Sequence, residues 1–162
     1  MLTEVDSRSV LVWRKKEFNM TRLPPPEVQA VYDSFPAVER EKLMLVRQLI
    51  LDCAALVEAG TVAETLRWGQ PTYLVKQGSS LRLGIGKTGL AAIFAHCQSS
   101  IISDFATAFG TDFEMDGNRA VYLDQLGAEE LEKLRFLILH GLQYKRAPKA
   151  RLTVTQMNLQ KK

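Results

Sequence analysis

Apolar residues recur every three or four positions in two long segments of the chain. The first segment, residues 43–57, follows a charged start and predicts a long amphipathic helix that ends near Gly60. The second, residues 129–142, opens with two glutamates and predicts the last helix. Shorter helices are expected over residues 27–34, after three prolines, and over residues 99–109. Most of these helices lie before or after a central region of the sequence, residues 72–123, in which the pattern is different.

Alternation of apolar and polar residues marks this central region. Residues 80–86 place aliphatic side chains on one side and Arg82 with two glycines on the other, which predicts a strand. Residues 72–76 and 90–97 are further strand candidates, and residues 113–123 predict a hairpin. Short strands joined by tight turns pair antiparallel. The sequence thus predicts an α+β fold: a single domain with an antiparallel sheet of about five strands and helices packed mainly on one face.

The segment E-T-L-R-W-G-Q-P-T-Y, residues 64–73, joins the long helix to the first of these strands. We expect a short helix over residues 62–68, capped by Thr61, because Glu64 stands at the position of a capping box. In that helix Glu64 and Trp68 are four residues apart and share one face. The Gly and Pro that follow force the chain out of the helix, at a place where side chains often border pockets.

The turns around this segment predict a ligand site. If the first strand pairs with the second, the turn after the second brings Lys87 back toward Tyr73. We therefore predict a cleft lined by Trp68 and Tyr73. Glu64 is expected on its rim and Lys87 near its mouth, and an aromatic wall with one acid and one base suits a small polar or cationic ligand. The alternative is structural: Trp68 caps the core, and Glu64 pairs with Lys87 or Arg67.

Composition and charge place the chain among ordinary globular proteins. Its 162 residues are 46% hydrophobic and 24% charged, with a net charge of +3, which fits one domain that folds without disulfides. We divide the chain into an N-terminal extension (residues 1–22), the α+β domain (residues 23–144) and a basic C-terminal tail (residues 145–162). No signal peptide or membrane-spanning segment is apparent, so we expect a cytoplasmic location and no membrane partner.

The basic tail and the two cysteines have simple interpretations. The tail carries no acid and no aromatic residue. Without aromatic side chains to stack on bases, nucleic acid is not the expected partner, although association with nucleic acid through the tail is an alternative. Cys53 and Cys97 each lie in an apolar run and are expected to be buried free thiols.

Three motifs suggest other chemistry. Residues 84–89 match the dinucleotide-binding pattern G-x-G-x-x-G, which needs a helix after the glycines. The half-polar strand before them favours a tight hairpin, and a nucleotide-binding enzyme using this loop is kept as an alternative. A Walker loop is excluded because Leu81 stands where a Gly is required. His96 and Cys97 point to opposite faces of a strand, so no metal site and no cofactor are predicted.

The series V-x-E-T-L-R-W-G-Q-P-T-Y, followed by a glycine-turn hairpin and a lysine, resembles the YdhG-like domain-of-unknown-function family. The resemblance covers residues 36–142, and its specific part is E-x-x-x-W-G-x-P-x-Y. The matching residues are Glu64, Trp68, Gly69, Pro71, Tyr73 and Lys87. The resemblance implies a compact α/β domain with an antiparallel sheet, usually small, cytoplasmic and bacterial. Some relatives are described as frataxin-like intracellular iron chaperones.

The chain departs from the family at one turn. Many members have a Lys-x-His-like turn there, whereas no histidine follows Lys87, so a shared metal or proton-transfer role does not carry over. Iron delivery needs exposed hard oxygen ligands, and Asp33, Glu39 and Glu41 form only a thin acidic patch.

These observations together predict a small binding domain of the YdhG-like family. Its ligand is expected at a cleft near the W-G-x-P-x-Y segment, and the resemblance adds an iron-chaperone-like role. No nucleophile, base and orienting group stand together at a recognised spacing, which favours binding over catalysis without deciding it. The identity of the ligand and the oligomeric state are left open.

Overall fold

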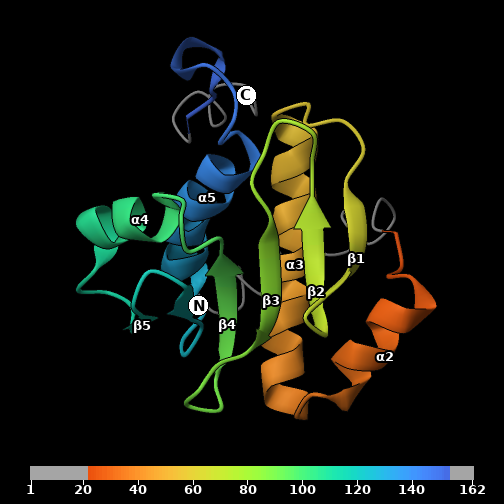
Figure 1. Cartoon of the computed structure of the whole chain (residues 1–162). Coiled ribbons are helices and arrows are strands. Elements are labelled where there is room, and N and C mark those ends of the chain that lie inside the picture. Colours follow the sequence, from red (N-terminus) through yellow and green to blue (C-terminus); the bar gives the residue numbers. More distant parts are fainter. Residues whose placement is uncertain (1–21, 154–162) are drawn as a thin grey trace, which may run out of the picture.

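The computed structural model of the chain describes residues 22–153 (Figure 1). The helices are α2 (Pro26–Ser34), α3 (Ala37–Leu56), α4 (Ile101–Phe109) and α5 (Ala128–Leu142), followed by a short 3-10 turn (Pro148–Ala150). The strands are β1 (Ala63–Arg67), β2 (Gln70–Leu74), β3 (Leu81–Ile85), β4 (Ala91–Ala95), β5 (Met115–Asp116) and β6 (Ala120–Tyr122). Prolines directly precede the first turns of α2 and α3, where their fixed φ favours helix initiation.

The strands form one antiparallel sheet in the order β1-β2-β3-β4-β6-β5. Glu64 of β1 lies opposite Tyr73 of β2, and Arg82 of β3 lies opposite Phe94 of β4. Tight turns join β1 to β2 and β3 to β4, and both turns lie at the lower end of the sheet in Figure 1. The predicted α+β class is confirmed, with six strands in the sheet in place of about five.

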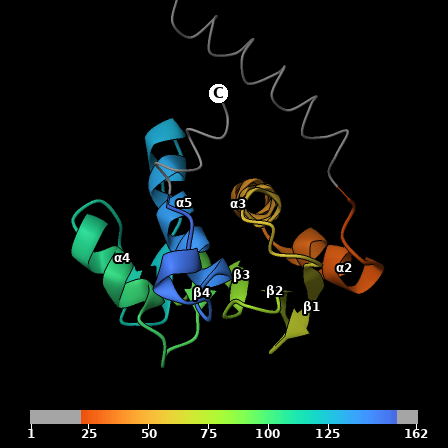
Figure 2. The same ribbon diagram turned by 90° about the horizontal axis from the view of Figure 1, so that it is seen from above.

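The helices lie on one side of the sheet (Figure 2). Helix α3 contacts β3 and β4, α2 contacts β1 and β2, and α4 packs on α5. We call the other side of the sheet, which no described helix covers, the open face. It carries Gln70, Arg82, Gly84, Ala92, Phe94, Ala120 and Tyr122. Of these, Ala92, Ala120 and Tyr122 are buried in a small hydrophobic cluster of their own. The fold thus separates a covered face, which forms the core, from a face with polar and aromatic side chains.

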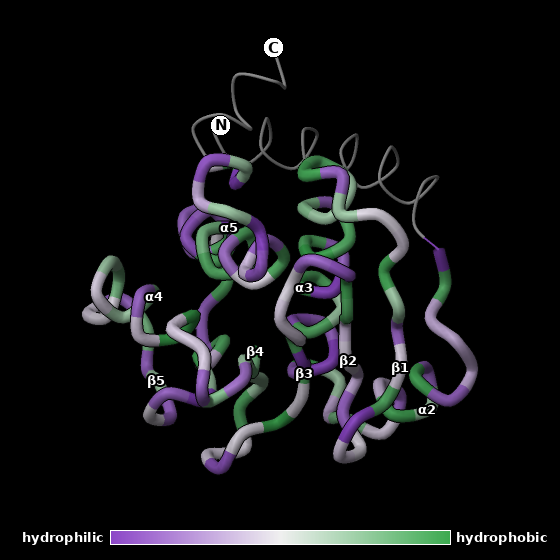
Figure 3. The backbone as a smooth tube through the Cα atoms, turned by 45° about the horizontal axis from the view of Figure 1, so that its top comes forward, coloured by the Kyte–Doolittle hydropathy of each residue, from purple (hydrophilic) through white to green (hydrophobic). Residues whose placement is uncertain are grey.

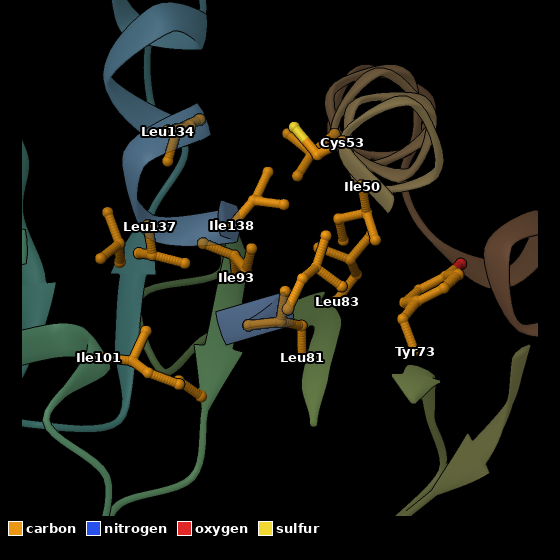
Figure 4. Packing of buried hydrophobic residues seen from close by; sticks show 14 of the residues in the cluster. Ile50, Cys53, Tyr73, Leu81, Leu83, Ile93, Ile101, Leu134, Leu137 and Ile138 are labelled. Carbon is orange, nitrogen blue, oxygen red and sulfur yellow. The ribbon is translucent and has the colours of Figure 1, made fainter. Parts of the chain in front are cut away.

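The hydrophobic core fills the space between α3, α5 and the sheet (Figure 4). Ile50 of α3, Ile138 of α5 and Leu83 of β3 meet there and are fully buried. Hydrophobic and hydrophilic segments alternate along α3 and α5 (Figure 3), as one-sided burial of a helix requires.

The helix predicted over residues 62–68 is wrong, because residues 63–67 form strand β1. The side chain of Glu64 is buried and Leu66 packs against the core, while Arg67 is exposed. A charged residue on the covered face hides the alternation that marks a strand. With β1 in place of a helix, the predicted capping box at Thr61 does not form.

The described part of the predicted basic tail, residues 145–153, packs on the domain. The amide of Gln143 donates to the Leu152 carbonyl and accepts from the Leu152 N–H. Arg151 donates to the carbonyls of Tyr144 and Arg146. No helix within residues 22–153 is both long and apolar enough to cross a membrane. The remainder of the predicted extension and tail, residues 1–21 and 154–162, lies outside the described residues.

Candidate functional site

The residues predicted to line one cleft are divided between the two sides of the sheet. Glu64 and Tyr73 face each other across β1 and β2, and both side chains are buried on the helix side. Trp68 lies in the β1–β2 turn and packs against the open face. Lys87 lies in the β3–β4 turn, 3.8 Å from a carboxylate oxygen of Asp116. The predicted common cleft is therefore wrong, because Glu64 and Tyr73 belong to the core.

Glu64 is the centre of a buried hydrogen-bonded network. Its carboxylate accepts from Arg47 of α3, whose Nε and Nη2 lie at 2.6 and 2.9 Å. It also accepts from the Tyr73 hydroxyl at 2.7 Å, and that hydroxyl in turn accepts from Tyr32 of α2 at 2.6 Å. The Arg47 and Glu64 side chains are 2% and 1% exposed. We call these four residues the Glu64 network, which joins α2, α3 and the β1–β2 hairpin.

Burial and mutual contacts shift the pKa values of Tyr73, Tyr32 and Arg47 in this network. Burial raises the pKa of Tyr73 far above its ordinary value, and Tyr32 and Glu64 raise it further. Burial also raises the pKa of Tyr32. Burial by itself lowers the pKa of Arg47, but the hydrogen bond and charge of Glu64 outweigh it, and the net shift is upward. The Arg47–Glu64 ion pair has almost no solvent contact, so it is not accessible to a ligand.

Trp68 occupies a turn position that a bulky side chain disfavours. Trp68 and Gly69 have φ angles of 52° and 73°, the two positive values of a type I′ hairpin turn, where Asn-Gly is preferred. This conformation costs a residue with a Cβ roughly 1–2 kcal/mol. The Trp68 residue is 78% exposed, so it does not cap the core. Neither the local conformation nor core packing accounts for a Trp at this position.

The ring of Trp68 meets Arg82 on the open face. The Arg82 Cζ lies 4.9 Å from the centre of the Trp68 ring and 5.5 Å from the centre of the Phe94 ring. The Arg82 Nη1 donates to Oε1 of Gln70 at 2.6 Å. We call Trp68, Gln70, Arg82 and Phe94 the Arg82 cluster. A cation–π contact at an exposed site contributes about 0.5–1 kcal/mol, which is less than the turn conformation of Trp68 costs.

Arg82 is a partly buried cation without an acidic partner in the described part of the chain. Within residues 22–153 its one hydrogen bond is to Gln70, and no Asp or Glu forms a salt bridge with it. Burial lowers the pKa of its guanidinium, because a charge that is partly removed from water is less stable. The guanidinium therefore retains N–H donors for an anion from outside the chain, whereas Arg47 has its carboxylate inside the fold.

Gly84 and Gly86 keep the centre of the open face flat. A Cβ on Gly84 would lie 2.7 Å from Nε2 of Gln70, and a Cβ on Gly86 would overlap the ring of Tyr122. The side chains of Gln70 and Tyr122 therefore lie close against the β3 backbone. After Gly89 the chain continues into β4, a strand, so the glycines do not face the helix N-terminus that dinucleotide binding requires.

A second polar cluster lies where α4 begins and α5 ends. Nε2 of His140 is 2.7 Å from Oδ2 of Asp104, and the Tyr144 hydroxyl accepts from the Ser100 N–H at 2.9 Å. Hydrogen bonds, first from Ser100 and then from His140, lower the pKa of Asp104. Asp104 stands between the Ser100 side chain and the His140 imidazole, whereas a nucleophilic triad needs the imidazole in the middle. This cluster therefore connects α4 to α5.

Metal-binding side chains do not gather in the described residues. Residues 22–153 contain no group of three or more His, Cys, Asp or Glu positioned to hold a metal ion. Glu39, a member of the predicted acidic patch, is occupied by the Ala91 N–H at 2.7 Å and by Lys42 at 3.5 Å. The predicted burial is confirmed for Cys53 and wrong for Cys97, which is exposed.

Comparisons of the chain with protein-family models, with curated proteins and with solved structures found no match. A function is therefore inferred below from the geometry and chemistry of the described residues.

The partners in both clusters are not among the predicted site residues, although two of them carry a signal in the sequence. Arg47 lies four residues after Leu43 and three before Ile50, which places a charge on the apolar face of α3 and indicates a buried partner. Arg82 shares a strand face with two glycines, an arrangement typical of a surface approached by other groups. Phe94 lies inside a continuous apolar run, where no alternation distinguishes its face.

Proposed function

We propose that this protein is a binding domain that takes a planar, anionic ligand on the open face of its sheet, at the Arg82 cluster. One observation carries the proposal: Trp68 is exposed and held in a disfavoured turn conformation over an arginine that has no acidic partner among the described residues. Residues held in such backbone conformations cluster at ligand sites, where the strain serves function.

The chemistry of the cluster selects the ligand. Arg82 supplies a positive charge and N–H donors that suit a carboxylate or a phosphate. Trp68 supplies a ring face open to solvent, on which a flat group can stack. The sequence predicts a polar or cationic ligand because Glu64 is expected on the rim. With Glu64 buried and neutralised by Arg47, the accessible charge of the site is positive, and an anion is the better partner.

The resemblance to the YdhG-like family remains a proposal, supported by the E-x-x-x-W-G-x-P-x-Y series. The Glu and Tyr of that series, Glu64 and Tyr73, are hydrogen-bonded to each other, and its Trp lies in the proposed site. We do not carry the iron-chaperone role forward, because the described residues hold no group of three metal-binding side chains. A cationic site also repels a metal cation.

The substitution Trp68→Asn tests the proposal on the full chain. Binding is followed by thermal shift against aromatic carboxylates and nucleotides, with neutral and cationic aromatic compounds for comparison. We expect planar anions to raise the melting temperature of the wild type, and this shift to disappear in Trp68→Asn and in Arg82→Gln. Val38→Asn removes another exposed apolar side chain, from α3, and should bind as the wild type does. A wild type that binds no planar anion, or both variants binding normally, contradicts the proposal.

A further inference from the structure

We infer that the ligand of the open face is a single-stranded nucleic acid, which rests on the proposed function and names the molecule that supplies the planar anion. A nucleotide strand carries flat bases that stack on aromatic side chains and phosphates that pair with cations. Trp68 and Arg82 offer these two complementary groups together, with the Arg82 Cζ over the Trp68 ring and 4.9 Å from its centre.

The site is an open surface, which favours a strand over a free nucleotide. Pockets for small molecules bury most of the surface of their ligand, whereas the turn that carries Trp68 is largely exposed. A single nucleotide gains one stacking contact and one ion pair there. A strand adds contacts along the sheet, where the partly buried ring of Phe94 continues the aromatic surface beyond Trp68.

Two further cations surround the Arg82 cluster at the same end of the sheet. Arg67 ends β1 directly before Trp68, and alternation places it on the open face because Leu66 packs on the core. Two strand spacings, about 10 Å, separate β1 from the β3 strand of Arg82. The Lys87 side chain is 74% exposed, and its Nζ lies 3.8 Å from Oδ1 of Asp116, near the upper limit for a salt bridge. Such an exposed pair is weak, so a phosphate can take the place of Asp116 beside Lys87. This spread of charge suits successive phosphates of one strand.

The folded sheet combines positive charge with aromatic rings, whereas the basic tail carries positive charge alone. The sequence predicts no nucleic-acid partner because no aromatic residue stands among the basic residues of residues 145–162. On the sheet, Trp68 and Phe94 come from separate parts of the chain and meet at Arg82. Folding therefore brings Arg82 and Phe94 to Trp68, which Arg67 already precedes in the sequence.

The test uses the full chain with Trp13→Phe, which leaves Trp68 as its single tryptophan. Quenching of its fluorescence is measured with a homopolymeric single strand of about ten nucleotides, a length within the usual site size of one binding module. The corresponding duplex, the mononucleotide and inorganic phosphate are titrated in parallel. We expect the single strand to bind most tightly, with log affinity falling against log salt at about −0.7 per phosphate contacted, or about −2 for three cations.

Two charge-matched substitutions locate the binding surface. Arg82→Gln should weaken binding of the single strand at least about tenfold, the scale of losing one hydrogen bond to a charged group. Lys149→Gln removes the same charge from the C-terminal segment and should leave the affinity unchanged. Equal binding of mononucleotide and strand, or a loss in Lys149→Gln instead of Arg82→Gln, overturns the inference. If the single strand does not bind while an aromatic carboxylate still quenches Trp68, the inference fails and the proposed function stands; if neither binds, both fail.

Discussion

The β1–β2 hairpin contributes side chains to two clusters on opposite sides of the sheet. On the helix side, Glu64 and Tyr73 join Arg47 in a network inside the fold, and the Glu64 carboxylate also lies 3.7 Å from Arg22. On the open face, Trp68 of the turn lies over Arg82, a cation with no described acidic partner. Both clusters place an arginine beside aromatic rings, but only the first satisfies its charge.

The difference separates residues that stabilise from residues that bind. A buried, fully partnered ion pair makes the surrounding elements depend on one another, because removing either charge strands the other in the core. A partly buried arginine beside an exposed Trp contributes little to folding and keeps its donors available. Sequence proximity is no guide to this distinction, since Glu64 and Trp68 are only four residues apart.

The largest effect is expected for Glu64→Ala. The substitution leaves the Arg47 guanidinium buried without its carboxylate, so the free energy of unfolding should fall by about 3–5 kcal/mol. Urea unfolding followed by circular dichroism measures the loss. Replacing both partners, as in Arg47→Met with Glu64→Leu, removes both charges and should recover most of the stability. A loss below about 1 kcal/mol for Glu64→Ala would show that the Glu64 network does not stabilise the fold.

Alanine substitutions of Gly84 and Gly86 test how closely side chains pack against the backbone on the open face. In Gly86→Ala the new methyl group meets the Tyr122 ring, which cannot move without disturbing its neighbours, so stability should fall by about 1–3 kcal/mol. In Gly84→Ala the new group meets the flexible end of Gln70, and the loss should be clearly smaller. The two variants are compared by thermal unfolding. Equal losses would contradict the arrangement of these side chains against β3.

A smaller, pH-dependent effect is expected for Asp104→Asn. The pKa of Asp104 is held below its ordinary value of 3.8 by Ser100 and His140, so its stabilisation is present above that pH and is lost as the pH falls through the lowered pKa. The side chain is half exposed, and solvent screening limits the difference at neutral pH to less than about 1 kcal/mol. Unfolding from pH 7 to pH 2 measures it. A difference between wild type and variant that grows on acidification would contradict this sign.

Much of the fold is predictable from the chain because its helices and most strands bury one face and expose the other. The periodicity of α3 and α5, and the alternation in β3, come directly from that one-sided burial. Strand β1 is the exception. Glu64 occupies a covered position, and only its contact with Arg47, 17 residues away, explains why a charge belongs there. No local pattern contains that information.

The candidate site was predicted only in part, for a related reason. The position of Trp68 before Gly69 marks an unusual turn, and the sequence analysis identified it. The face toward which Trp68 points depends on whether residues 63–67 form a helix or a strand, and that choice depends on the buried partner of Glu64. Arg82 and Phe94 are paired across β3 and β4, a register that turn lengths and packing determine together.

The most direct test of the comparison is the stability of Trp68→Asn, measured by urea unfolding alongside its affinity for a planar anion. Asn tolerates positive φ better than Trp and is favoured in type I′ turns, and few contacts are lost with an exposed ring. We predict that the free energy of unfolding stays the same or rises by up to about 1 kcal/mol, while binding of the anion is lost. If the free energy of unfolding falls by more than about 1 kcal/mol, or if the affinity for the anion is unchanged, Trp68 stabilises the fold and does not bind the ligand.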